Sequence, residues 1–112
     1  MTLVDTSVWV DHFRRGNSAL RGLLEEGGVT THPMVLGELA CGSLARRAET
    51  LRLLRRLPSI RQAPDNIVLQ AIESFSLWGK GIGWIDAHLL VASQLSGVPL
   101  WTLDQRLARL AP

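Results

Sequence analysis

The sequence predicts an α/β fold in which a short parallel sheet is covered by helices on both faces. Two observations indicate this class. Short apolar runs alternate with longer segments whose apolar residues repeat at helical spacing. Each apolar run is followed closely by a helix-capping residue or by proline. Strands that alternate with helices build parallel sheets, because each connection crosses the sheet through a helix. With 112 residues, we expect one domain over residues 1–112.

The first half of the chain is expected to form two strands and four helices. The run TLV ends at Asp5, where Thr6 or Ser7 is expected to cap a helix, and Pro33 suits the first turn of another. Pro58 ends the last helix of this half. In order, the predicted elements are a strand at 2–4, helices at 6–13 and 18–26, a strand at 29–31, and helices at 33–42 and 43–57.

The second half is expected to form three helices and one strand. Gly97 closes the helix before the strand, and Asp104 opens the last helix. Glycines at 79, 81 and 83 make a turn between the first two helices. In order, the predictions are an extended piece at 59–63, helices from Pro64 to Phe75 and at 84–96, a strand at 98–103, and a short terminal helix.

The composition predicts a cytoplasmic globular protein. Apolar residues make up 46% and charged residues 20%, which excludes a disordered chain. No apolar stretch approaches the roughly 20 residues of a membrane span, and we expect no membrane association. The N-terminus lacks the basic and apolar segments of a secretion signal. The single cysteine, Cys41, excludes a disulfide within the chain.

The arginines are concentrated in one short stretch, although the formal net charge is only +2. Such a cluster suits a polyanion such as RNA, and it equally suits a solvated helix face. The candidate RNA-binding residues are Arg46, Arg47, Arg52, Arg55 and Arg56, with Arg61 nearby.

Four acidic residues stand where the surrounding pattern predicts no charge. Asp5 and Asp104 directly follow apolar strands, and ligands bind at the carboxyl ends of parallel strands. The alternative for each is a helix cap. Glu38 and Asp86 lie on otherwise apolar helical sides, where a buried carboxylate needs a cation or an ion-pair partner. Because clustered carboxylates repel one another, a divalent ion such as Mg²⁺ or Mn²⁺ is the predicted partner.

Four segments of the chain resemble the VapC-type PIN-domain toxins: LVDTSVWVDHFRRG, THPMVLGELACGS, IGWIDAHLLVASQ and LWTLDQRL. The resemblance implies a three-layer α/β/α PIN domain in which the four acids hold one or two Mg²⁺ or Mn²⁺ ions. It also implies RNA cleavage, a VapB-like antitoxin partner, a homodimer, and supporting hydroxyls at Thr6 and Thr102. Family members continue into a further strand, so a chain that stops at Pro112 is expected to lack that last edge strand.

The predicted reaction is hydrolysis of an RNA phosphodiester by metal-activated water. Asp5 and Asp86 are expected to bind the metal directly, whereas Glu38 and Asp104 act through water, a second ion or the proton of the nucleophile. Two alternatives stay open. One is a PIN-like module that binds nucleic acid or protein with weak or no catalysis. The other is a phosphatase, which would need a second aspartate at position 7, where this chain has serine.

Several other residue types are interpreted as structural rather than catalytic. Cys41 is expected in the core. The tryptophans are expected in helices or strands, where packing accounts for them better than base stacking does. The histidines are His12, His32 and His88, and the tryptophans are Trp9, Trp78, Trp84 and Trp101.

Overall fold

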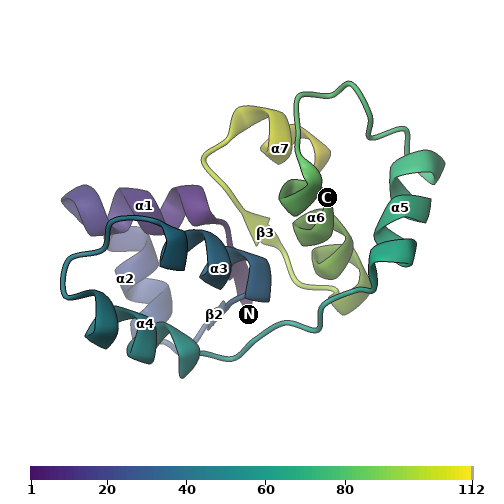
Figure 1. Ribbon diagram of the computed structural model, residues 1–112. Coiled ribbons are helices and arrows are strands. Elements are labelled where there is room, and N and C mark those ends of the chain that lie inside the picture. Colours follow the sequence, from purple (N-terminus) through teal and green to yellow (C-terminus); the bar gives the residue numbers. More distant parts are fainter. Residues whose placement is uncertain (112) are drawn as a thin grey trace.

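A computed structural model describes residues 1–111 and shows a small parallel sheet between two groups of helices (Figure 1). The sheet has the strand order β2-β1-β3, and both pairings are parallel. This arrangement confirms the predicted α/β class with a short central parallel sheet. The strands are β1 (Thr2–Val4), β2 (Val29–Thr30) and β3 (Leu100–Trp101); the helices are α1 (Thr6–Arg15), α2 (Ser18–Glu25), α3 (Pro33–Cys41), α4 (Arg47–Arg55), α5 (Asp65–Ser74), α6 (Trp84–Ser96) and α7 (Gln105–Leu110).

The central strand β1 brings its two neighbours into register at the edge where it ends. Leu3 pairs with Thr30 of β2 and with Leu100 of β3, and the N–H of Asp5 donates to the carbonyl of Trp101 at 2.9 Å. Leu3 and Val4 are fully buried. The residues that follow β1 and β3 therefore emerge side by side at one edge of the sheet.

Helix α6 is the most deeply buried helix and joins the apolar clusters of the core. All residues from Ala87 to Ser93 are buried. Leu89 packs with the sheet, Val91 with α5, and Leu90 with α7. Fully burying each of these leucines stabilises the fold by about 1.5–3 kcal/mol. Asp86, at the N-terminal end of α6, is therefore positioned by a helix that is packed into the core.

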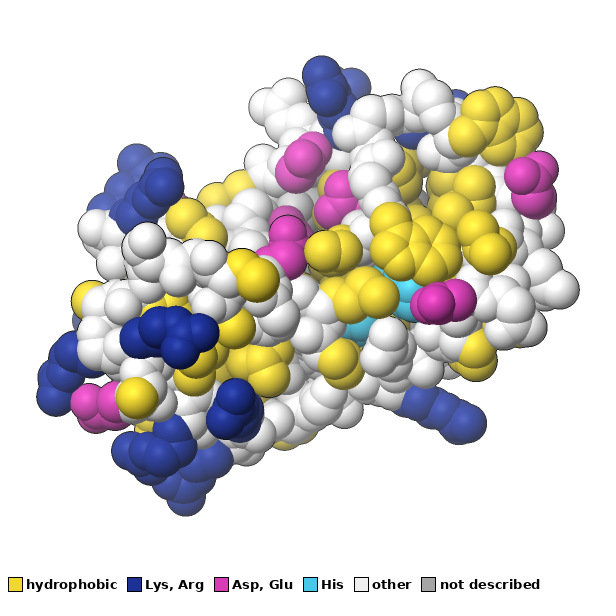
Figure 2. Space-filling model, in the orientation of Figure 1, with side chains coloured by type: hydrophobic (Ala, Val, Ile, Leu, Met, Phe, Trp, Pro, Cys, Tyr) yellow, Lys and Arg dark blue, Asp and Glu magenta, His cyan; other side chains and the backbone are white. Residues whose placement is uncertain are grey.

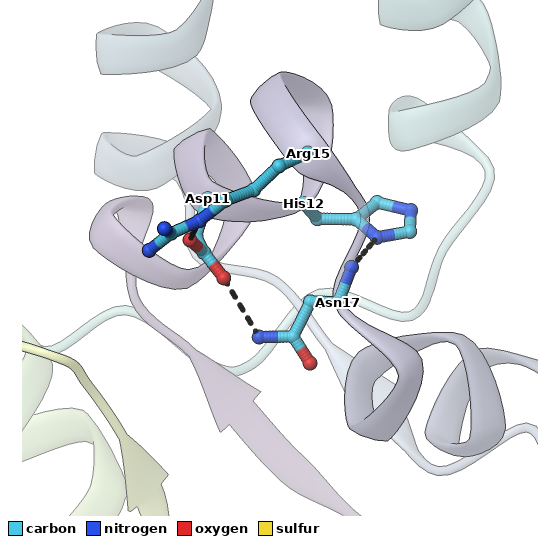
Figure 3. A network of polar contacts seen from close by, with 4 residues as sticks. All are labelled: Asp11, His12, Arg15 and Asn17. Carbon is cyan, nitrogen blue, oxygen red and sulfur yellow. Dashed lines mark hydrogen bonds and ion pairs between the residues drawn. The ribbon is translucent and has the colours of Figure 1, made fainter.

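A polar network joins α1 to α2 (Figure 3). Asp11 accepts from Arg15 Nε at 2.6 Å and from Asn17 Nδ2 at 3.1 Å, and these hydrogen bonds hold the pKa of the Asp11 carboxyl below its usual value. The backbone N–H of Asn17 donates to Nδ1 of His12, and the Asn17 side chain caps α2 by accepting from the N–H of Leu20. Asn17 is thus the N-cap of α2.

Two predicted elements are shorter in the structure. The helix expected at 43–57 spans only Arg47–Arg55, because Arg46 has a left-handed backbone with φ of 49° that separates α4 from α3. The strand expected at 98–103 is reduced to Leu100–Trp101, because the N–H of Val98 is bonded to the carbonyl of Ser93 in α6 and Pro99 has no N–H to donate. In residues 1–111 no helix has the length and apolar character to cross a membrane.

Candidate active site

Asp5 is held at the end of β1 by hydroxyl groups. It is the most buried of the four predicted acids, with 6% of its surface exposed. Its Oδ2 atom accepts from Ser7 Oγ at 2.6 Å and from Thr102 Oγ1 at 2.7 Å. The same oxygen accepts from the N–H of Ser7 at 3.4 Å, so Asp5 also caps α1. The cap and the ligand interpretations are therefore compatible.

Asp104 is joined to Asp5 through Thr102. The Thr102 hydroxyl that donates to Asp5 also accepts from the N–H of Asp104 at 3.0 Å. Oδ1 of Asp104 accepts from the N–H groups of Arg106 at 2.8 Å and Leu107 at 3.2 Å, and so caps α7. This chain of bonds confirms that the carboxylates after β1 and β3 lie at the same edge of the sheet.

Glu38 reaches the same region from α3. Its Oε1 atom accepts from Thr6 Oγ1 at 2.7 Å, and Thr6 is the first residue of α1, directly after Asp5. Glu38 is exposed, as is Asp104. The prediction that Glu38 is a buried carboxylate is wrong, because the side of α3 that carries it faces solvent rather than the core.

Asp86 lies in the first turn of α6, where its Oδ2 accepts from the N–H of Gly83 at 3.1 Å. Burial raises the pKa of Asp86, and the negative charges of Asp5 and Asp104 raise it further, while the Gly83 hydrogen bond opposes both effects. The three carboxylates are therefore close enough to repel one another, as expected for a cluster that binds a cation.

All four acids use their oxygens in the same way. Within residues 1–111 one oxygen of each carboxylate accepts hydrogen bonds, and the other oxygen accepts none. No three of the described His, Cys, Asp and Glu side chains form a preassembled ion cage. Hard ions such as Mg²⁺ bind oxygen and keep several waters, so they need only a few carboxylates around them. The donor set fits such an ion.

Ser7 is a residue that the sequence interpretation did not assign to the site. Its hydroxyl donates to Asp5, lies 3.3 Å from the Thr102 hydroxyl, and accepts from the N–H of Leu103 at 3.0 Å. It thereby ties the start of α1 to the segment after β3. The sequence did contain a signal for this role, because two hydroxyl residues, Thr6 and Ser7, directly follow Asp5. A single predicted helix cap accounted for both hydroxyls, so Ser7 was not assigned to the site.

The predicted RNA-binding arginines lie around α4, away from the acids. Figure 2 shows several acidic side chains near the middle of this face, whereas the dark blue side chains lie toward its edges, including the α4 end. Arg46 pairs with Glu49 at 3.0 Å, and Arg47 donates to the carbonyl of Ala40 at 2.8 Å. No ion pair in residues 1–111 involves the three remaining candidates, which are the exposed Arg52, Arg55 and Arg56.

The histidines have structural roles, as expected. His32 and His88 are fully buried, with ring centroids 6.0 Å apart. His32 Nδ1 accepts from the N–H of Met34 and caps α3, while His88 Nε2 lies 3.1 Å from Oδ1 of Asp65. Burial, together with the charge of His88, lowers the pKa of His32 to about 4.

Two predictions about packing are wrong. Cys41 is exposed rather than part of the core, because it ends α3 at the solvent side. Trp78 lies in a turn and has 61% of its surface exposed, so it belongs to neither a helix nor a strand. Its position in the loop between α5 and α6 removes it from the core that holds Trp9.

Comparison with known proteins agrees with this architecture. The sequence profile of the PIN domain matches residues 2–111, and the chain therefore belongs to the PIN-domain family. It is also 42% identical over 108 residues to Ribonuclease VapC32 from two strains of Mycobacterium tuberculosis. That similarity covers 96% of this chain and 87% of the relative, so within the family the chain is of the VapC type.

Proposed function

We propose that residues 1–112 form a single ribonuclease domain that cleaves RNA phosphodiester bonds with the help of Mg²⁺ or Mn²⁺. The observation that carries the proposal is the shared arrangement of Asp5, Glu38, Asp86 and Asp104, which each keep one carboxylate oxygen free of hydrogen bonds from the described residues 1–111. Similarity to a protein named Ribonuclease VapC32 supports RNA as the substrate.

Each acid has a distinct place in the proposed reaction. Asp5 and Asp86 would hold the ion directly, because one stands at the end of β1 and the other at the N-terminal end of the buried α6. Glu38 and Asp104 are more exposed, and they would orient water near the ion or accept the proton of the attacking water. A bound ion lowers the pKa of water and neutralises charge on the scissile phosphate.

The hydroxyl groups of Thr6, Ser7 and Thr102 position the carboxylates. Each donates to one oxygen of an acid and so orients the other oxygen of that acid. A hydroxyl donor also stabilises the ionised carboxylate, which is the form that binds a metal. Thr6 and Thr102, the two threonines implied by the family resemblance, would thus orient the acids, and Ser7 would do the same.

We also propose the partners that a VapC-type protein implies: an RNA substrate, a VapB-like antitoxin that silences the enzyme, and a second copy of the chain. The apolar hollow between α5 and α6 supports a homodimer, since Phe75 and Leu95 line it and are each more than half exposed. Light scattering of the purified protein tests the dimer, and co-purification with the antitoxin tests the complex.

The function is tested by incubating the purified protein with structured RNAs in Mg²⁺ or Mn²⁺. We expect cleavage that EDTA abolishes and that the Asp86→Asn variant lacks. The matched control is Asp11→Asn, because Asp11 is an ionised aspartate in the α1–α2 network and takes no part in the proposed site. Chelator-insensitive cleavage contradicts the proposed metal dependence.

The two alternative functions give different results in the same preparation. A binding module would retain RNA or Mn²⁺ without cutting the RNA. A phosphatase would release inorganic phosphate from small phosphomonoesters, a reaction for which Ser7 replaces the required second aspartate. Hydrolysis of phosphomonoesters at a rate above that of RNA cleavage would contradict the proposal.

A further inference from the structure

Arg106 is the arginine that lies nearest in sequence to the four acids, and its exposed side chain packs against a glycine of the loop before α6. Its backbone N–H is bonded to Oδ1 of Asp104 at 2.8 Å. The side chain lies across Gly81, where an added Cβ would be 2.6 Å from Cδ, 3.1 Å from Nε and 3.2 Å from Nη1 of Arg106. Gly81 has φ of +81°, a conformation that side chains other than glycine rarely adopt.

Within residues 1–111 the guanidinium of Arg106 has no acidic partner despite this position. No ion pair or side-chain hydrogen bond in residues 1–111 involves it. The contact with Gly81 draws the side chain toward the loop that leads to Gly83, whose N–H binds Asp86. A charged donor thus stands between two acidic segments without neutralising either.

A surface hollow of about 310 Å³ lies beside this guanidinium. Asp104, Gln105, Arg106 and Arg109 line it, so the carboxylate of the site and two arginines share one depression. Arginine binds phosphate through two parallel hydrogen bonds, and because its planar fork is pre-organised, it loses less entropy per bond than a lysine does. The hollow fits a nucleic-acid phosphate better than a base, because its charged lining offers no aromatic ring.

We propose that Arg106 is a substrate-binding residue that contacts the RNA phosphate adjacent to the one cleaved at the four acids, and that Gly81 holds it there. The proposal rests on the proposed ribonuclease function. Carboxylates and a bound ion would engage the scissile phosphate, while Arg106 fixes the register of the strand. Phosphate contacts position a nucleic acid without reading its sequence. Arg106 is therefore expected to affect binding of every RNA substrate alike.

The first test measures KM, kcat and RNA affinity for Arg106→Ala. We expect KM to rise about 10-fold, the effect of losing one hydrogen bond to a charged group, with kcat within about 2-fold of wild type. The Mn²⁺ concentration for half-maximal activity should not change. The matched control is Arg21→Ala, since Arg21 is an exposed arginine of α2 far from the acids in sequence. Equal KM values for the two variants would overturn the proposal.

The second test measures binding without cleavage. The affinity of Asp86→Asn protein for an RNA oligonucleotide is followed over a range of KCl concentrations, with and without Arg106→Ala. One lost phosphate contact lowers the slope of log K against log salt by about 0.7. An unchanged slope overturns the inference. Because this measurement needs no catalysis, it stands even where the wild-type protein fails to cut RNA, which would contradict only the proposed function.

The third test asks whether Gly81 acts through Arg106. Gly81→Ala should raise KM in the wild-type background, because the new Cβ displaces the arginine. The same change should leave KM unaltered in the Arg106→Ala background. Thermal unfolding of each variant in parallel identifies a loop that has lost its fold. Equal effects of Gly81→Ala in the two backgrounds would mean that Gly81 is needed only for the conformation of its loop, and would overturn its proposed effect on Arg106.

Discussion

Thr102 Oγ1 donates a 2.7 Å hydrogen bond to Oδ2 of Asp5 across 97 positions of the chain. The same oxygen of Thr102 accepts from the N–H of Asp104. One hydroxyl therefore joins the acid that follows β1 to the acid that follows β3. Because the parallel register of these strands creates the contact, the geometry of the site depends directly on the sheet.

Replacing Thr102 by valine should weaken metal binding. Valine has nearly the same shape but removes the donor to Asp5 and the acceptor for Asp104, so both carboxylates gain freedom. Loss of a group that orients a metal ligand typically costs 10- to 100-fold in affinity or activity. A Mn²⁺ titration of RNA cleavage measures this loss of metal affinity. Thr50→Val is the control, because its hydroxyl only bonds the carbonyl of Ala45 within the α4 segment; equal Mn²⁺ requirements in the two variants would contradict the role of Thr102.

Thr6 and Glu38 should act as one unit. Thr6 donates to Glu38 at 2.7 Å across 32 positions, so Thr6→Val should lower cleavage only while Glu38 is present. The double variant with Glu38→Gln should be no less active than Glu38→Gln alone. Rates from the double-mutant cycle give the coupling, for which residues in contact show roughly 0.5–3 kcal/mol. Fully additive effects would mean that Thr6 does not position Glu38.

Asp86→Asn should stabilise the protein in the absence of divalent ions. Burial and the charges of Asp5 and Asp104 raise the pKa of Asp86, which means that the ionised group is held at a cost. Asparagine removes the charge and can still accept from Gly83. We expect a higher Tm than wild type at pH 7 in EDTA, a smaller gain on adding Mn²⁺, and loss of cleavage on the order of 100-fold. A Tm below that of the wild type in EDTA would contradict electrostatic repulsion of the Asp86 carboxylate by Asp5 and Asp104.

Acid should destabilise the fold through His32. Its pKa is about 4 in the folded protein and about 6.5 in the unfolded chain, so the unfolded state takes up a proton first as pH falls. Stability should therefore drop between pH 6.5 and 4, by at most about 1.4 kcal/mol per pH unit, and this contribution should level off below pH 4. Urea unfolding at several pH values measures the slope.

His32→Asn provides the control for that pH dependence. Asparagine can still cap α3 by accepting from the N–H of Met34, but it does not titrate. The variant should be less stable at pH 7, because it leaves space in the core, and its stability should fall less steeply between pH 6.5 and 4. An identical slope in both proteins would assign the acid sensitivity to other groups.

The α4 arginines should contribute to RNA affinity rather than to the chemical step. Arg52 and Arg55 are exposed and take part in no ion pair within residues 1–111. Arg52→Ala with Arg55→Ala should weaken binding of long RNAs and reduce its salt dependence, while kcat for a short substrate stays unchanged, because α4 lies away from the acids (Figures 1 and 2). Unchanged affinity for long RNA would favour the interpretation of a solvated helix face.

The sequence by itself determined the local parts of this protein. Apolar periodicity placed α6, and Asp104 marked the start of α7, because capping depends on residues within one turn of each other. The cap of α1 was predicted wrongly, since it is Asp5 and not Thr6 or Ser7. The four acids were also recognisable locally, from their strand ends and from their unusual neighbours. Burial was less predictable: Glu38 is exposed, since sequence spacing does not state which side of a helix meets the core.

The tertiary structure alone decided how these parts meet. The contacts of Thr6 with Glu38, of Ser7 with Thr102, and of Arg106 with Gly81 join residues 25 or more positions apart. Such contacts follow from the packing of separate elements, which local spacing does not encode. The parallel register of β1 with β3 likewise brings Asp5 and Thr102 together at one edge of the sheet.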